Sequence, residues 1–214
     1  VAGSNLLMEC YKRWGADAIR DSDGTKLDEG IKSLDAKIYT TYFVARGHNE
    51  FAQQHMEECQ QIYLMSAYTL ATENQVSIAF AKEYFDQQVT PDYDHDPKVW
   101  WEVMDRTTDE VVDPANWDYD KEHHIVTVNN VIPFHEYTVS FLAYILWDPT
   151  QMYNHITNDW GDKPHEIPFD VRKPASAQYV VDYLKQWLKD NPDTDVVRFT
   201  TFFYHFTLIF NARA

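Results

Sequence analysis

Residues 178–203, QYVVDYLKQWLKDNPDTDVVRFTTFF, contain a helix pattern and a strand pattern in direct succession. Apolar side chains recur in the first half at helical spacing, which is typical of a helix with one buried face. They are Tyr179, Val180, Tyr183, Leu184, Trp187 and Leu188. Asn191 and Pro192 end this helix, and the apolar residues within 195–203 predict a buried strand. A helix that returns the chain into a buried strand is part of a βαβ unit, so the stretch predicts a parallel sheet.

The N-terminal residues twice place a polar segment directly after a strand. Residues 6–14 predict a helix, which Gly15 ends. Residues 16–19 and 38–43 predict strands, and each of them runs into a polar loop. With the strand near the C-terminal end, we expect about four such strands, half the number in a closed (β/α)8 barrel. The fold class expected from these elements is α/β.

The middle of the chain departs from this alternation. We expect a helix between about residues 55 and 88, followed by a turn-rich break at 91–97. Residues 100–112 predict a hairpin, and the alternation at 124–128 predicts a further strand. These patterns predict a β-hairpin insertion in the main fold at about residues 91–131.

The composition limits the classes of partner. Aromatic residues make up 15% of the chain, with 7 Trp and 14 Tyr, which suits either sugar binding or a large ordinary core. The formal net charge of −16 and the absence of a basic stripe argue against nucleic acid and anionic membranes. Cys10 and Cys59 fit neither a disulfide framework nor a zinc site, so we expect a cytoplasmic protein.

Common catalytic motifs are missing from the sequence. It contains no glycine-rich nucleotide loop and no Gly-x-Ser-x-Gly turn. Asp94-His95-Asp96 has a form that binds Mg²⁺ or Mn²⁺ in some sugar transferases, but Pro91 and Pro97 flank it, as is typical of an acidic turn. We therefore expect no metal site and no cofactor.

Two arginines stand at or within predicted strands. Arg20 could fork onto sugar hydroxyls or phosphate, with Asp21 and Asp23 orienting it. The alternative is a polar turn with a surface arginine. Arg198 interrupts the apolar strand near the C-terminal end, and a charge in a buried strand must be paired or face a cavity. A structural ion pair is equally compatible with that position.

A third candidate is the polar segment 147–162, which follows a dense apolar run and is expected to be a loop. It contains Asn154, Asn158, Asp159 and Trp160, which are side-chain types that hydrogen-bond to sugars or stack on them. A well-packed structural loop is the alternative.

Five segments, in chain order, resemble the galacto-N-biose/lacto-N-biose phosphorylase family. They are RWGADAIR at 13–20, WEVMDRTT at 101–108, PFHEYTVSFLAY at 133–144, MYNHITNDWGD at 152–162, and residues 195–210. Matches of this length are far more specific than a short motif, and together they extend over nearly the whole chain.

The resemblance implies that residues 1–214 are the N-terminal part of a (β/α)8 catalytic barrel with a β-rich insertion, in a cytoplasmic homodimer. It implies inverting phosphorolysis of β-1,3-galactosyl-N-acetylhexosamine, with inorganic phosphate as co-substrate and α-galactose 1-phosphate as product. By matching position, Arg20, Asn154 and Arg198 are substrate contacts. Thr150 lies where family members vary, and it bears on acceptor choice.

The family's general acid is expected downstream of Ala214, so neither Asp159 nor Asp162 is assigned that role. The 214 residues alone are expected to be inactive. Three alternatives stay open: a β-1,4-galactosyl-rhamnose phosphorylase, a non-catalytic sugar-binding module, and a structural half-barrel that pairs with another chain.

Overall fold

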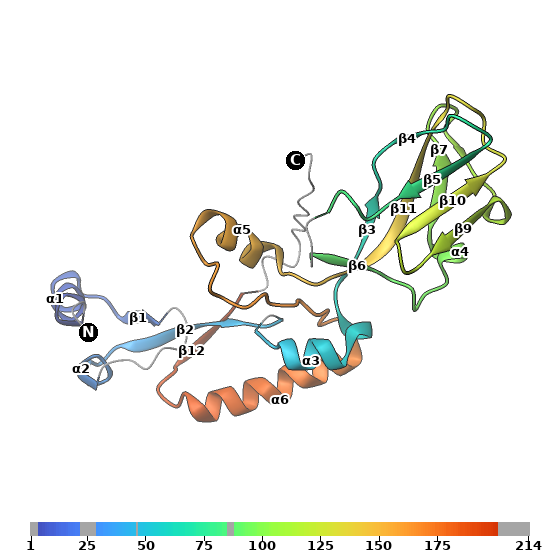
Figure 1. The fold of residues 1–214 in the computed structure, drawn as a ribbon. Coiled ribbons are helices and arrows are strands. Elements are labelled where there is room, and N and C mark those ends of the chain that lie inside the picture. Colours follow the sequence, from blue (N-terminus) through green and yellow to red (C-terminus); the bar gives the residue numbers. More distant parts are fainter. Residues whose placement is uncertain (1–3, 22–28, 46, 85–87, 201–214) are drawn as a thin grey trace. The chain divides into compact units, whose positions relative to one another are not determined.

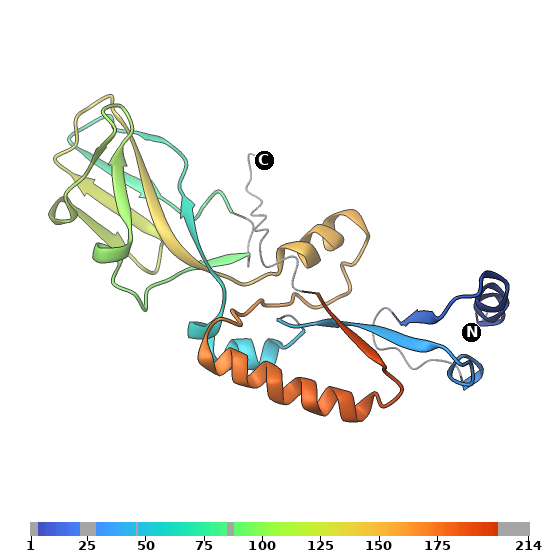
Figure 2. The ribbon, with the colours of Figure 1, turned by 180° about the vertical axis from the view of Figure 1, so that it is seen from behind.

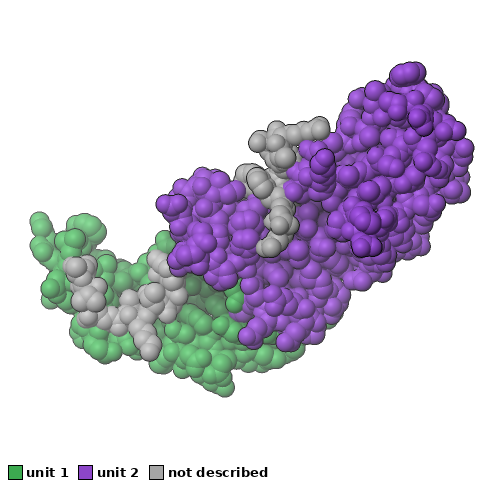
Figure 3. Space-filling view, viewed as in Figure 1, with its two compact units in different colours: residues 1–47, 170–206 green, residues 48–169, 207–214 purple. Residues whose placement is uncertain are grey.

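The computed structural model describes residues 4–21, 29–45, 47–84 and 88–200, drawn as a coloured ribbon in Figure 1. The chain divides into two compact units, coloured in Figure 3. One comprises residues 1–47 and 170–206, and the other comprises 48–169 and 207–214. Asp23 and residues 201–203 lie outside the described residues.

The first unit contains a parallel three-stranded sheet in the order β1-β2-β12. Its strands are β1 (Ala18–Asp21), β2 (Lys37–Phe43) and β12 (Val196–Thr200). Its helices are α1 (Ser4–Trp14), α2 (Glu29–Lys32) and α6 (Pro174–Asp190). The helix and strand predicted from 178–203 are confirmed as α6 and β12, and the strand predicted at 38–43 is confirmed as β2.

Helix α6 runs along one side of the sheet in both ribbon views (Figure 1; Figure 2). Tyr42 of β2 points to that side, and its ring centroid lies 5.5 Å from the ring of Trp187 and 6.3 Å from that of Tyr183. Lys173 precedes the helix and Pro174 occupies its first turn, where a missing N–H has no cost. Trp187 and Tyr183 of the predicted apolar stripe therefore pack on the sheet, while Tyr183 and Leu188 keep 41% of their surface exposed.

Asp195 fixes the register between β2 and β12. Its backbone N–H donates to the Ile38 carbonyl at 3.0 Å, and its carboxylate accepts from the Ile38 N–H at 2.9 Å. The ammonium of Lys37 donates to the other carboxylate oxygen at 3.0 Å. The Ile38 N–H, followed by Lys37, holds the pKa of Asp195 below its ordinary value. These contacts set Val196 beside Tyr39 at the start of the ladder.

The second unit is mainly antiparallel sheet. One sheet has the order β3-β11-β7-β8, with β4 and β6 also paired to β11, and the other has the order β5-β10-β9. The strands are β3 (Gln61–Met65), β4 (Thr69–Leu70), β5 (Gln75–Ala79), β6 (Val89–Pro91), β7 (Glu102–Asp105), β8 (Glu110–Val111), β9 (Trp117–Asp120), β10 (Ile125–Asn129) and β11 (Glu136–Ile145). Helical segments are α3 (Asn49–Gln54), η1 (Met56–Glu58), α4 (Pro97–Trp100), η2 (Pro114–Asn116) and α5 (Pro149–Thr157).

The helix expected between residues 55 and 88 is wrong. After η1 the chain forms β3, β4 and β5, and in β5 the side chains of Val76 and Ile78 are buried while their neighbours are exposed. That period of two is a strand pattern, and it fills the core together with Phe80 and Phe141, whose ring centroids are 4.7 Å apart. Antiparallel structure thus extends from Gln61 to Ile145, well beyond the 91–131 expected for the insertion.

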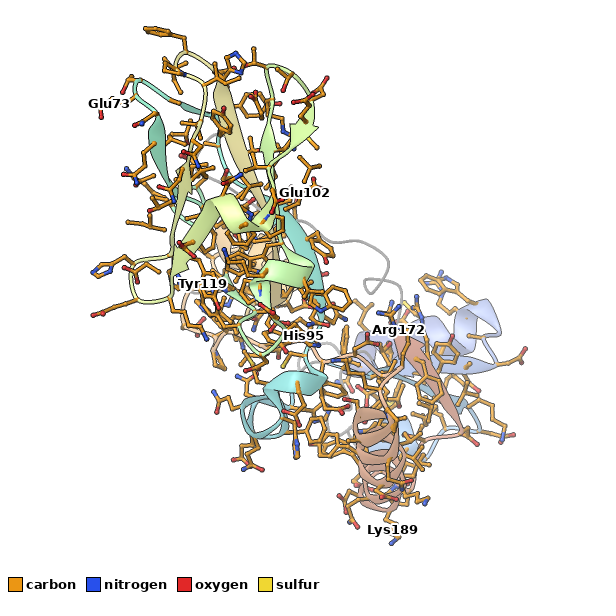
Figure 4. All side chains as sticks on the ribbon, turned by 90° about the vertical axis from the view of Figure 1, so that its right-hand side faces the viewer. Glu73, His95, Glu102, Tyr119, Arg172 and Lys189 are labelled. Carbon is orange, nitrogen blue, oxygen red and sulfur yellow. The ribbon has the colours of Figure 1, made fainter. Side chains whose placement is uncertain are left out.

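Three aspartates of this unit share one turn arrangement. Each carboxylate accepts hydrogen bonds from two backbone N–H groups of the turn that follows it, and lies close to a histidine Nδ1. The pairs are Asp92–His95, Asp105–His135 and Asp120–His123, at 2.7, 2.7 and 2.8 Å. Burial alone would raise the pKa of Asp92, but the hydrogen bonds outweigh it and the pKa lies below its ordinary value. In Figure 4 the labels of His95 and Tyr119 mark this unit.

No helix among the described residues is both long enough and apolar enough to span a lipid bilayer.

We predict that Asp195→Ala lowers the melting temperature of the protein by several degrees, since it removes the register contacts to Ile38 and Lys37. Because the folded pKa of Asp195 is depressed, its contribution is complete above the ordinary value of 3.8 and is lost as pH falls through the folded pKa. The gap between wild type and variant, measured by thermal unfolding, should therefore narrow below about pH 4.

Asp17→Ala is the matched control. Asp17 precedes β1 as Asp195 precedes β12, and its exposed carboxylate bonds to no residue that the structure describes. Equal losses in the two variants would contradict the assigned role of Asp195.

Candidate functional site

The sheet register places Arg20 and Arg198 on the same face. Arg20 lies opposite Tyr39, and Arg198 lies opposite Thr41. Paired residues on neighbouring strands point to one face, and so do residues two apart along a strand. The two arginines therefore flank β2 on one side of the sheet, two strand spacings across and two residues along, with their Cα atoms roughly 12 Å apart.

This face is opposite to the one that α6 covers. The residues on the α6 side include Ile38, Thr40 and Tyr42, all of them buried. Burial, with a smaller effect of the neighbouring Tyr183, raises the pKa of Tyr42 to about 12. Asp21 lies opposite Thr40, so it also points to the α6 side. The expectation that Asp21 orients Arg20 is thus not met, because adjacent residues of a strand face opposite ways.

Neither Arg20 nor Arg198 has a partner within the described part of the chain. Arg13 pairs with Glu9 and Arg172 with Asp170, whereas no described residue forms a hydrogen bond or ion pair with Arg20 or Arg198. Both side chains are exposed. The expectation of a buried strand around Arg198 is therefore wrong, because β12 is the last strand of the described sheet and only β2 pairs with it.

Two free guanidinium groups on one face can hold a ligand rich in oxygen. The chain carries 34 acidic and 18 basic residues, so a shortage of carboxylates does not explain why Arg20 and Arg198 lack partners among the described residues. An arginine presents a planar set of N–H donors that fits phosphate oxygens and vicinal hydroxyls. The arrangement thus creates local positive charge in an acidic protein.

In the segment 147–162, where a loop is expected, the structure has a helix, α5, which carries the candidates Thr150 and Asn154. The Asp148 side chain accepts from the Gln151 N–H at 2.9 Å, and Pro149 occupies the first turn. These two residues make a helix start, which explains why so polar a segment is helical.

Thr150 and Asn154 share one face of α5, and Asn158, which caps the end of the helix, follows at the same spacing of four. The Asn154 amide donates to the Thr150 carbonyl at 2.9 Å, and its oxygen accepts from the Asn158 amide at 2.6 Å. Asn154 keeps one N–H donor free of described partners. This face is a fixed row of polar groups suited to hydrogen-bonding a sugar.

The remaining candidates, Asp159 and Trp160, lie beyond the end of the helix. Asp159 has a positive φ of 57° and is exposed, and Trp160 is 38% exposed. The structure therefore groups Arg20 with Arg198 in one unit, and Thr150, Asn154 and Asn158 in the other.

Gln151 was missed in the sequence, although it holds α5 in place. Its side-chain oxygen accepts from the Trp147 indole N–H at 3.0 Å and from the Glu166 N–H at 2.6 Å, and its amide donates to the Pro164 carbonyl. Asn49 fastens the same segment by donating to the His165 carbonyl at 2.6 Å. The spacing of four between Trp147 and Gln151 could have indicated this contact, because residues four apart at a helix start lie close together.

His165 completes the packing beneath α5. Its ring lies parallel to Trp147 with centroids 3.5 Å apart, and His155 meets Trp147 edge-on at 5.1 Å. Burial, and then the proximity of His155, lower the pKa of His165. The neutral imidazole is therefore favoured next to the indole.

Within the described residues, no group of three or more His, Cys, Asp or Glu side chains is arranged to hold a metal ion.

Comparison with known proteins identifies the family. Residues 2–214 match the family described as the lacto-N-biose phosphorylase N-terminal TIM barrel domain. The chain belongs to this family.

Named relatives in the family differ in their degree of similarity. The chain is 56% identical over 205 residues to the 1,3-beta-galactosyl-N-acetylhexosamine phosphorylase of Bifidobacterium longum subsp. longum, covering 96% of this chain and 27% of that protein. A phosphorylase of the same name from Lachnoclostridium phytofermentans is 50% identical, with 95% and 28% covered. The D-galactosyl-beta-1->4-L-rhamnose phosphorylase of that organism is 35% identical, with 94% and 28% covered. The chain thus spans just over a quarter of these relatives' length.

We predict that Gln151→Ala lowers the free energy of unfolding by roughly 2–4 kcal/mol. Gln151 is 3% exposed, and its loss leaves the Trp147 N–H, the Glu166 N–H and the Pro164 carbonyl without this partner. Denaturant unfolding measures the change.

The matched control is Gln53→Ala, at an exposed position of α3. It should change stability by less than about 0.5 kcal/mol. An effect of Gln151→Ala no larger than that of the control would refute the assigned role.

Proposed function

We propose that the full-length protein carries out inverting phosphorolysis of β-1,3-galactosyl-N-acetylhexosamine, that is, galacto-N-biose or lacto-N-biose. Three matched relatives, at 56%, 50% and 46% identity, are named for that activity. The structural observation that carries the proposal is a pair of arginines, Arg20 and Arg198, that have no partner among the described residues and share the sheet face opposite α6.

In this proposal the parallel sheet is the N-terminal part of a (β/α)8 barrel. Helices surround such a barrel, so the sheet face opposite α6 is its interior. Active sites of these barrels lie at the carboxyl ends of the strands, where loops and strand ends meet. Arg20 is the third of four residues in β1 and Arg198 the third of five in β12, close to those ends.

The reaction exchanges one bond at the anomeric carbon. A phosphate oxygen forms a bond to C1 of the galactosyl group while the glycosidic C–O bond breaks, and a general acid protonates the departing oxygen. The configuration changes from β to α, giving α-galactose 1-phosphate and the N-acetylhexosamine. The general acid is proposed to lie outside this chain, and neither Asp159 nor Asp162 takes its place.

Arg20 and Arg198 are proposed to bind substrate or phosphate oxygens, and Asn154 a sugar hydroxyl. Thr150 lies one turn before Asn154 on α5 and is proposed to influence the acceptor. Asn158 supports this role by fixing the Asn154 oxygen. We further propose a cytoplasmic homodimer that needs phosphate as co-substrate and no cofactor.

A second candidate is phosphorolysis of β-1,4-galactosyl-rhamnose, which the 35% identical relative is named for. The two reactions share the galactosyl group and phosphate, and they differ in the acceptor sugar and in which of its hydroxyls is linked. The choice of acceptor in the reverse reaction therefore separates the two.

We predict that the full-length protein releases phosphate from α-galactose 1-phosphate when N-acetylgalactosamine or N-acetylglucosamine is the acceptor, and much less with rhamnose. Arg20→Gln and Arg198→Gln should each lower kcat/KM by roughly 10- to 100-fold, as expected for the loss of a charged hydrogen-bond donor. A coupled phosphate assay measures both effects.

Arg13→Gln serves as the matched control, since Arg13 is exposed on α1 and, among the described residues, pairs only with exposed Glu9 at 3.4 Å. Its kcat/KM should stay within about twofold of wild type. Absence of phosphate release with every acceptor would refute the proposed function, and preference for rhamnose would support the second candidate.

A further inference from the structure

Thr41 lies on the same sheet face as the two arginines. It is the register partner of Arg198 and stands two residues after Tyr39, the partner of Arg20. Its side chain therefore points from β2, the middle strand, to the side of the sheet opposite α6.

The hydroxyl of Thr41 is buried and has no hydrogen-bond partner among the described residues. The residue is 7% exposed. Its neighbour Thr40, which points to the α6 side, is 1% exposed, and its hydroxyl bonds to that of Thr194 at 3.1 Å. Two adjacent threonines of one strand thus differ in whether the hydroxyl is satisfied.

An unsatisfied buried hydroxyl carries an energetic cost, and such groups in native proteins usually indicate a missing partner. Valine has nearly the same shape and is likewise enriched in strands, so neither packing volume nor strand propensity requires a hydroxyl at this position. The two arginines on the same face, free of described partners, point to the kind of partner that is missing: a ligand with several oxygens.

We infer that Thr41 is a further ligand-binding residue, whose hydroxyl hydrogen-bonds to an oxygen of the group held by Arg20 and Arg198. This inference rests on the proposed function of that face. The oxygen belongs either to phosphate or to the galactosyl group, since both have oxygens that accept hydrogen bonds. Thr41 adds no charge, so its hydroxyl would orient the ligand, whereas the charged arginines would attract it.

The test compares Thr41→Val with Thr40→Val in the full-length protein. Isothermal titration calorimetry measures the Kd of inorganic phosphate, galactose and α-galactose 1-phosphate separately. Thr41→Val should raise the Kd of α-galactose 1-phosphate by about tenfold, as expected for the loss of one hydrogen bond. If the Kd of inorganic phosphate also rises, the contact is with phosphate. If the Kd of galactose rises instead, the contact is with the sugar.

The control should show the opposite pattern. Thr40→Val breaks the bond to Thr194, so it should lower the melting temperature and leave all three Kd values within about twofold. Thr41→Val should leave the melting temperature of the unliganded protein unchanged or raised, and Thr41→Ser, which keeps the hydroxyl, should retain most of the affinity.

Unchanged Kd values in Thr41→Val, in a protein that turns over α-galactose 1-phosphate, would overturn the role of Thr41 while the proposed function stands. Absence of both turnover and binding in the wild-type protein would overturn both.

Discussion

The contact of Asp195 with Ile38 and Lys37 is the constraint on which the proposed site depends. In a parallel sheet, a slip of one residue would turn every side chain of β12 to the other face. Arg198 would then point toward α6, and Phe199 would leave the side on which it now meets Tyr42 at 6.1 Å. Asp195 bonds both backbone groups of Ile38, the N–H through its carboxylate and the carbonyl through its own backbone N–H, and therefore decides which residues face a ligand.

The chain forms this pairing across a long interruption. Along the sequence, residues 48–169 of the second unit separate β2 from α6. Closing such a loop costs entropy, but the cost grows slowly with length. The inserted unit has its own core, in which Phe80 packs against Phe141 and Trp101 at 4.7 and 5.0 Å. It can therefore lengthen the connection without taking apolar contacts from the parallel sheet.

Sequence patterns predicted the elements whose apolar periodicity is unambiguous, such as helix α6 and the strands β2 and β12. They failed for β3–β5, where short apolar runs fit a helix as well as a strand. Helix α5 was missed because its residues are mostly polar, although Asp148 and Pro149 mark its start. Arg20 and Arg198 were found as candidates, but their common face follows only from strand register, which no local pattern specifies. The same register separates Asp21 from Arg20 and brings Thr41 beside Arg198.

The most direct test of the central claim is a crystal structure of the full-length protein with α-galactose 1-phosphate bound. The account predicts ligand oxygens within hydrogen-bonding distance of the guanidinium groups of Arg20 and Arg198, on the face of the sheet opposite Tyr42 and α6. A ligand bound away from this face, or a β12 shifted by one residue so that Arg198 points toward α6, would contradict it.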